Sequence, residues 1–199
     1  MVRKHQSTEI RQKQIVDAAR KVIIRYGSEH VTVKKIAKEV GISETAIYRH
    51  FKSKRDILFL LAEYIENSLI KDIDKANSVN ETSLEALNNV LKNHLSAVEQ
   101  RRGISFQIIA EIISLGDKKL NNRISKAIAR YIESIKKLLV KGIEAGEIRA
   151  DIDPDAAATA MFGIIQGLVN IWALSNYEFD PKERYTGLWT VFREAIIRR

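Results

Sequence analysis

The chain has 199 residues, a hydrophobic fraction of 45% and no cysteine, so disulfide frameworks, cysteine-based zinc sites and cysteine nucleophiles are excluded. Its net charge of +8 is uneven: residues 1–55 carry 14 Lys/Arg against 5 Asp/Glu, whereas residues 56–199 carry 19 against 20. This basic first quarter favours a polyanionic partner, the alternative being a solvated basic face. No apolar run follows the basic N-terminus, so we expect no signal peptide.

The pattern of apolar residues predicts an all-α fold, because β-branched residues recur at helical spacing and no Asn-Gly or Asp-Gly hairpin signal occurs. Both prolines follow an aspartate, and Asp153-Pro154 and Asp180-Pro181 are typical of a helix cap and its first residue. Thr82 and Glu85 have the spacing of a capping box. About nine helices are expected, over residues 8–26, 33–40, 44–50, 54–77, 83–100, 103–115, 118–145, 154–175 and 181–197.

Gly27 is expected to end the first helix, and Gly146 the seventh. The first and fourth helices also have a clear inner face. The first helix is expected to bury one side, made of Ile10, Ile15, Ala18, Ala19, Val22 and Ile23. The fourth has an apolar stripe of Ile57, Leu58, Leu61, Ile65 and Leu69.

Residues 32–51 contain the most specific pattern in the chain. Val33, Ile36, Ala37 and Val40 predict a short helix with one buried face, and Gly41 permits the positive φ that ends it. Ser43 can cap a second helix, whose inner face is formed by Ala46, Ile47 and Phe51. Two short helices joined by a tight glycine turn are typical of a helix-turn-helix.

The outer face of this motif suits the major groove of DNA. It carries Lys34, Glu44, Thr45, Tyr48, Arg49 and His50. Arginine and lysine can donate to guanine, threonine can contact a thymine methyl group, and tyrosine and histidine can reach phosphates. The alternative is a helical hairpin with a solvated polar face, in which Tyr48 and His50 are half-buried packing residues. The charge bias and the glycine turn together favour DNA binding.

These residues resemble the signature of the TetR family of transcriptional regulators, densely over residues 10–61 and weakly afterwards. The matching pattern is Thr32-x3-Ile36-Ala37-x3-Gly41-Ile42-Ser43-x4-Tyr48-x-His50-Phe51-x2-Lys54. Residues 146–154, which lead into an Ala/Gly-rich helix, are also similar to the family. The resemblance implies a three-helix DNA-binding head at residues 1–53, and a larger helical body for effector binding and dimerisation at residues 54–199.

The resemblance also implies roles for single residues of the head. Thr32, Tyr48, His50 and Lys54 match positions that usually hold phosphates, and Lys34, Glu44 and Thr45 match positions that often face bases. Arg49 matches a variable position that faces either base or backbone. Glu44 either accepts from a cytosine amino group or repels phosphate and sharpens selectivity.

Residues 156–177 carry no charge over 22 positions, which is long enough to span a bilayer, and Gly163 and Gly167 have the spacing of a membrane dimer motif. Acidic flanks and interspersed polar residues oppose that interpretation, so we expect no membrane partner. A small, polar stripe of Thr159, Gly163, Gln166, Gly167 and Asn170 predicts a dimer interface, in line with the family's pairing of its last two helices. A broad apolar stripe of Met161, Ile164, Ile165, Leu168 and Trp172 would face the subunit core. The alternative is the central helix of a monomeric bundle.

The family usually binds a small effector between its fifth and eighth helices, which implies a pocket in the body of this chain. The candidate residues are His94, Phe106, Ile109, Ile113, Tyr131, Met161, Ile165 and Trp172. Because few polar groups accompany this set, we expect a hydrophobic or amphipathic effector. Plain core packing is the alternative for each of these side chains.

Catalytic and metal-binding patterns are missing from the sequence. The four histidines have no metal-ligand spacing, and no phosphate-binding loop, dinucleotide fingerprint or nucleophile elbow occurs. Asp151, Asp153 and Asp155 alternate like metal ligands, but capping of the helix that begins at Pro154 explains them better. We therefore expect no enzyme, no metal and no cofactor.

The sequence predicts a cytoplasmic homodimer that binds a pseudo-palindromic site on double-stranded DNA and is released by its effector. A repressor is favoured over an activator, and activation stays an open alternative. A constitutive DNA-binding protein of the same fold and a helical enzyme with an incidental helix-turn-helix are the alternatives.

Overall fold

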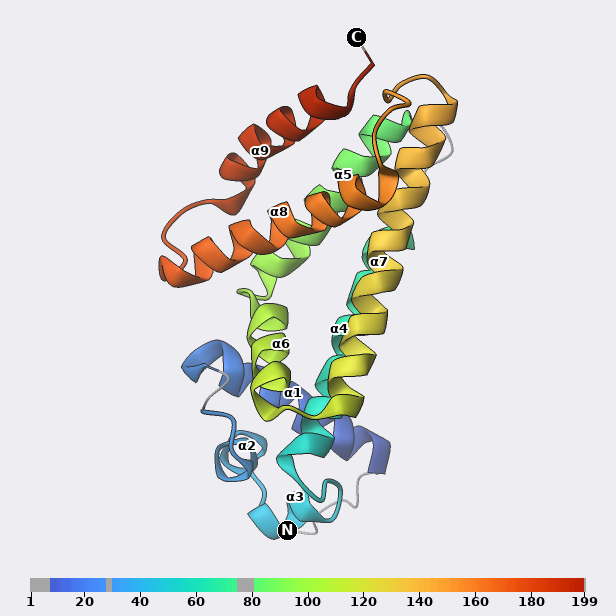
Figure 1. Cartoon of the computed structure of the whole chain (residues 1–199). Helices are drawn as coiled ribbons and strands as arrows, with labels where there is room; N and C mark the ends of the chain where they lie inside the picture. Colours follow the sequence, from blue (N-terminus) through green and yellow to red (C-terminus); the bar gives the residue numbers. More distant parts are fainter. Residues whose placement is uncertain (1–7, 28–29, 75–80, 199) are drawn as a thin grey trace. The chain divides into compact units, whose positions relative to one another are not determined.

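The computed structural model describes residues 8–27, 30–74 and 81–198, and within these ranges the chain folds into nine α-helices (Figure 1). Among the described residues, Ile148 and Ile197 form an isolated antiparallel β-bridge. The expected all-α fold is therefore confirmed. The helices are α1 (Thr8–Tyr26), α2 (Val33–Val40), α3 (Glu44–Tyr48), α4 (Lys54–Asp74), α5 (Ser83–Gln100), α6 (Ile104–Leu115), α7 (Lys118–Glu144), α8 (Pro154–Leu174) and α9 (Pro181–Ile196).

The helix starts follow from capping side chains that the sequence predicts. The Asp153 carboxylate accepts from the amides of Asp155 and Ala156, at 2.9 and 3.3 Å, and Asp180 accepts from the amide of Lys182 at 2.7 Å. Thr82 and Glu85 form the reciprocal capping box at the start of α5. Each cap satisfies amides that have no partner inside the helix.

The described helix boundaries lie within two residues of the expected ones, and one burial prediction is wrong. The third helix ends at Tyr48 rather than 50, because the His50 amide donates to the Ile47 carbonyl at 2.8 Å in a tighter turn. The sixth begins at Ile104 rather than 103, because Gly103 has a φ of +66°, outside the helical region. Ile10, expected on the inner face of α1, is 52% exposed. The expected end of the fourth helix, at residue 77, lies outside the described residues.

The chain divides into two compact units. The first comprises residues 1–65 and 104–124, and the second comprises residues 66–103 and 125–199, so α4 and α7 contribute to both. In the first unit α1 packs against α2 and α6, and α2 packs against α3. Its core includes Ile15, Ala19, Ile36, Ile47 and Leu58, each fully buried. The expected domain boundary at residue 53 stays a prediction.

In the second unit α5, α8 and α9 pack together (Figure 1). The Tyr185 hydroxyl of α9 donates to Asn88 of α5 at 3.0 Å. α7 comes close to the loop that follows it, since a Cβ on Gly142 would lie 2.6 Å from Cδ1 of Ile148. By length and composition α8 would suffice to cross a membrane, but its Met161, Ile165 and Trp172 are buried in this unit.

Candidate nucleic-acid interface

The turn between α2 and α3 has the geometry that the sequence predicts. Gly41 has φ of 75° and ψ of 35°, a left-handed conformation, and its amide donates to the Ala37 carbonyl at 3.0 Å. The amide of Ile42 donates to the same carbonyl at 3.0 Å, which ends α2. Ser43 Oγ then accepts from the Ala46 amide at 3.2 Å and starts α3. The backbone conformation, rather than lack of space, requires glycine here, because nothing lies within 4 Å of the position of its missing Cβ.

The inner faces of both helices are buried, which fixes the orientation of their outer faces. Ile36 and Ile47 are 0% exposed, Ala37 is 3% exposed and Phe51 is 4% exposed. Val33, Val40 and Ala46, the remaining predicted inner residues, are half-buried. The hydrophobic spacing therefore identified this face correctly.

Six of the eight proposed DNA-contacting side chains are exposed. They are Thr32, Lys34, Glu44, Thr45, Tyr48 and Arg49. Tyr48 is 51% exposed, so about half of its surface is available for a contact with DNA. His50 and Lys54 are half-buried. Nδ1 of His50 is buried and has no hydrogen-bond partner among the described residues, so packing accounts for part of its position.

Thr32 has two tasks in this arrangement. Its Oγ1 accepts from the Lys35 amide at 3.2 Å and so caps the N-terminus of α2. A hydroxyl that accepts in this way still has its own proton to donate. Capping of α2 is thus compatible with a hydrogen bond from the same group to a phosphate oxygen.

The peptide that joins α3 to α4 is held by a side chain that sequence reasoning missed. Asp56 Oδ2 accepts from the amides of Lys52 and Ser53, at 2.8 and 3.2 Å, and so fixes the backbone immediately before Lys54. The spacing of Ser53 and Asp56 matches a capping pattern, and that signal could have identified it.

Lys54 and its neighbour Arg55 each have an acidic partner. Lys54 Nζ lies 2.6 Å from Glu111 Oε1 of α6, and Arg55 pairs with Asp117 in the turn before α7. Asp117 also accepts from the amides of Leu120 and Lys119, and the Leu120 hydrogen bond, followed by Arg55, lowers the pKa of its carboxyl group. These pairings join residues more than fifty positions apart, so no local pattern indicates them.

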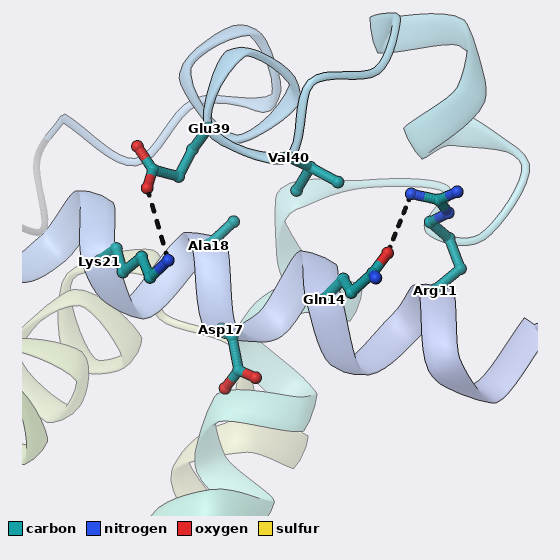
Figure 2. A pocket seen from close by; sticks show the side chains of 7 residues that line it. All are labelled: Arg11, Gln14, Asp17, Ala18, Lys21, Glu39 and Val40. Carbon is teal, nitrogen blue, oxygen red and sulfur yellow. Dashed lines mark hydrogen bonds and ion pairs between the residues drawn. The ribbon is translucent and has the colours of Figure 1, made fainter. Parts of the chain in front are cut away.

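Two ion pairs join α2 to α1. Figure 2 shows the pair between Glu39 of α2 and Lys21 of α1, whose Nζ lies 3.8 Å from the carboxylate. Glu39 also lies 3.4 Å from Nη1 of Arg25, another residue of α1. Beside them an open groove of about 480 Å³ runs between the two helices, and within it Arg11 donates to Gln14 at 2.9 Å. Charges of both signs line this groove, so it has no strong preference for an anion.

In the second unit α8 has two different faces. Met161, Ile165, Leu168 and Trp172 of the broad apolar stripe are buried, and Ile164 is half-buried. Of the expected dimer residues, Gln166 is half-buried, whereas Thr159, Gly163, Gly167 and Asn170 are exposed. Ile171 and Leu174, which sequence reasoning did not include, extend the exposed face and are 53% and 81% exposed. In the single chain, α8 is therefore buried on one side and exposed on the other.

The proposed effector residues fall into both units. His94, Tyr131, Met161, Ile165 and Trp172 are buried in the second unit, where the rings of His94 and Tyr131 lie 5.1 Å apart. A cavity of only about 10 Å³ adjoins Met161 and Ile165, with Trp189 and Phe192 of α9 among its lining residues. Phe106, Ile109 and Ile113 belong to α6 of the first unit, where Ile113 is 65% exposed. Sequence reasoning missed the aromatic contribution of α9.

Each carboxylate of the acidic triplet at the start of α8 has a partner within the protein. Asp153 caps the helix, Asp151 binds Arg149, and Asp155 lies 2.9 Å from Lys136 Nζ. No cluster of three metal-ligating side chains occurs among the residues that the structure describes. Capping and pairing with cations therefore explain these carboxylates.

Two family models together cover most of the chain. The model of bacterial regulatory proteins of the tetR family matches residues 15–61, and the model of the C-terminal region of YsiA-like proteins matches residues 62–191. This chain belongs to the TetR family of transcriptional regulators. TetR regulators bind DNA, typically as dimers, and the family consists of regulators rather than enzymes.

Similar members of the TetR family have two kinds of role. The fatty acid metabolism regulator protein of Bacillus subtilis (strain 168) is 29% identical over 167 residues, covering 84% of this chain and 86% of that protein. The nucleoid occlusion factor SlmA of Vibrio cholerae serotype O1 is 26% identical over 171 residues, covering 85% and 87%. The solved structure of the regulator FadR from Bacillus subtilis in complex with stearoyl-CoA superposes with a TM-score of 0.75 at 27% identity, covering 92% and 95%.

Proposed function

We propose that this TetR-family regulator is a cytoplasmic, ligand-responsive repressor that binds a pseudo-palindromic operator as a homodimer. The exposed outer face of α2 and α3 supports this proposal most directly. It places Lys34, Thr45 and Tyr48 around a glycine turn in the strongly basic quarter of the chain. Lys34, Glu44, Thr45 and Arg49 read bases, whereas Thr32, Tyr48, His50 and Lys54 hold phosphates.

Two copies are needed because one recognition helix contacts too few base pairs to be selective. The exposed face of α8 supports pairing through Thr159, Gly163, Gln166, Gly167 and Asn170. Nothing lies within 4 Å of the position of a Cβ on Gly163 or Gly167, so a helix of a second copy can approach both closely. Exposed Ile171 and Leu174 add apolar area to the same surface.

The effector is a long-chain fatty acyl-CoA, in keeping with the stearoyl-CoA bound by the Bacillus subtilis relative. His94, Tyr131, Met161, Ile165 and Trp172, all in the second unit, provide the apolar surroundings that an acyl chain requires. The cavity of about 10 Å³ beside Met161 holds no more than one water molecule, so an acyl chain that enters there displaces packed side chains. In that case the packing around Met161 differs between the bound and free proteins.

The nucleoid occlusion relatives favour a second candidate, a constitutive DNA-binding protein of the same fold that responds to no acyl ligand. One experiment distinguishes the two candidate functions. Purified protein is titrated onto a duplex from upstream of its own gene, with stearoyl-CoA, with free coenzyme A as the control, or with neither. Release by stearoyl-CoA alone supports the repressor. Binding that is unchanged by stearoyl-CoA and other acyl-CoAs supports the constitutive protein, and no binding at all contradicts both.

A further inference from the structure

The first turn of α4 presents two adjacent cations, and each is paired with a carboxylate from another part of the same compact unit. Lys54 Nζ lies 2.6 Å from Glu111 Oε1, and Arg55 pairs with Asp117. Lys54 directly follows the turn that Asp56 fixes, and it is one of the four proposed phosphate contacts. One cation of the proposed interface is therefore already engaged within the protein.

Glu111 is unusual in its own helix. It is the single charged residue of α6, whose other residues are apolar apart from two serines and one glutamine. Lys54 is the hydrogen-bond partner of its carboxylate within the described part of the chain. Asp117, in contrast, accepts from the amides of Lys119 and Leu120 and so has a capping role besides its pairing with Arg55. The contact that the structure shows for the Glu111 carboxylate is therefore its ion pair with Lys54.

The ion pair between Lys54 and Glu111 is partly buried and still reached by solvent. The Lys54 side chain is 34% exposed and that of Glu111 is 18% exposed, so their attraction is less screened than that of an open surface pair. An ammonium group has three protons, so Lys54 can reach a phosphate while it still touches Glu111. That state places two anions on one cation, and the repulsion between them opposes DNA binding.

We propose that Glu111 lowers the affinity of this protein for DNA by competing with a backbone phosphate for Lys54. This inference rests on the proposed function, since it requires that α3 and the start of α4 face DNA. Glu111 acts through Lys54 and touches no base, so it changes affinity equally for every sequence. A displacement of α6 that moves Glu111 away from Lys54 would therefore raise the affinity of the protein for DNA.

The test compares Glu111→Gln with the unaltered protein. Glutamine keeps the shape of the side chain and removes its charge. Kd is measured against KCl concentration on two duplexes, one from upstream of the gene and one 40-base-pair duplex of mixed sequence. We expect Glu111→Gln to bind both duplexes about tenfold more tightly near 0.1 M salt. We also expect a log–log salt slope steeper by up to about 1.8, because in each subunit of a dimer Lys54 then neutralises a phosphate without sharing its charge with Glu111.

Two controls separate competition from a general change of charge. Glu63→Gln removes the same charge from the same unit, where Glu63 lies 3.8 Å from Arg123, and should change Kd by less than about twofold. Lys54→Met removes the proposed phosphate contact. In that background Glu111→Gln should bring no further gain. Thermal denaturation of each variant checks that it is folded, and Glu111→Asp, which shortens the side chain, replaces Glu111→Gln should the latter not fold.

Each result has a separate meaning. If the unaltered protein binds neither duplex, the proposed function and this inference both fall. If it binds, and Glu111→Gln binds with unchanged or lower affinity, only this inference is overturned. A gain of equal size in the Lys54→Met background also overturns it, because the effect then does not pass through Lys54.

Discussion

At the scale of single residues, the proposed interface contains side chains that serve the fold and remain able to contact DNA. Thr32 caps α2 through its hydroxyl oxygen and keeps its own proton, while Lys54 is held by Glu111 and keeps donors to spare. Tyr48 and Lys34 differ from them, because both are exposed and neither side chain forms a hydrogen bond or ion pair among the described residues. These two residues therefore allow phosphate and base contacts to be tested without loss of a structural contact.

Tyr48→Phe removes one hydroxyl group and leaves the ring in place. If that hydroxyl donates to a phosphate, binding should weaken by about 1–2 kcal/mol, and by the same amount for operator and mixed-sequence duplexes. The measurement is Kd on both duplexes at fixed salt. Loss confined to the operator would show that Tyr48 reads a base instead.

Lys34→Ala should weaken binding in a way that depends on the DNA sequence, unlike Tyr48→Phe. A lysine that donates to a guanine contributes about 1–3 kcal/mol of preference for that base, which the variant loses. The measurement is Kd across a set of operators with one base pair changed at a time. We expect the penalty for substitution to vanish at one or two positions and to persist elsewhere. A uniform loss over all operators would instead make Lys34 a phosphate contact.

At the scale of elements, the exposed face of α8 suits contact with a second copy of the chain. One side of it is buried within its own unit, and the other exposes Gly163, Gly167, Ile171 and Leu174. A two-fold interface brings the same surface of both copies together, so a residue near the axis meets its own counterpart. An added charge at such a position faces an identical charge across the interface.

Gly163→Arg should therefore prevent dimerisation, because it adds bulk and like charge where the copies meet. We expect the dimer dissociation constant to rise at least about a hundredfold, which corresponds to about 2.7 kcal/mol. Sedimentation velocity over a range of concentrations measures it. Ala129→Arg, at an exposed position of α7 in the same unit, adds the same side chain and should leave the dimer intact. Unchanged association of the Gly163 variant would contradict a dimer surface on α8.

At the scale of the whole molecule, the uneven charge predicts a strongly salt-dependent interaction. Roughly four or five proposed phosphate contacts for each subunit, about eight to ten for a dimer, release about as many counterions. A plot of log Kobs against log salt should then have a slope of about −8. A slope near zero would rule out the proposed mode of binding.

The proposed effector should also stabilise the folded protein. A ligand present at a hundred times its Kd adds about 2.7 kcal/mol, which for a chain of this size raises Tm by roughly 5–11 °C. Differential scanning calorimetry with stearoyl-CoA and with free coenzyme A measures the effect. Equal curves for both would count against an acyl-CoA effector.

The sequence by itself determined the helices and the helix-turn-helix. Caps such as Asp153, the left-handed Gly41 and the spacing of Ile36 and Ile47 act over a few residues, so a local pattern contains the whole signal. The left-handed Gly103 was missed although it is equally local, because glycine is also tolerated in the first turn of a helix.

Only the tertiary structure decided which distant groups meet. The pairing of Lys54 with Glu111, the contact of Gly142 with Ile148 and the exposed face of α8 all depend on packing between separate segments. Helical periodicity assigns a residue to a face of its own helix, but it does not state what that face contacts. A carboxylate fifty-seven positions away from a lysine becomes its partner only once the chain has folded, and this is why the charge available to the proposed interface could not be read from the sequence.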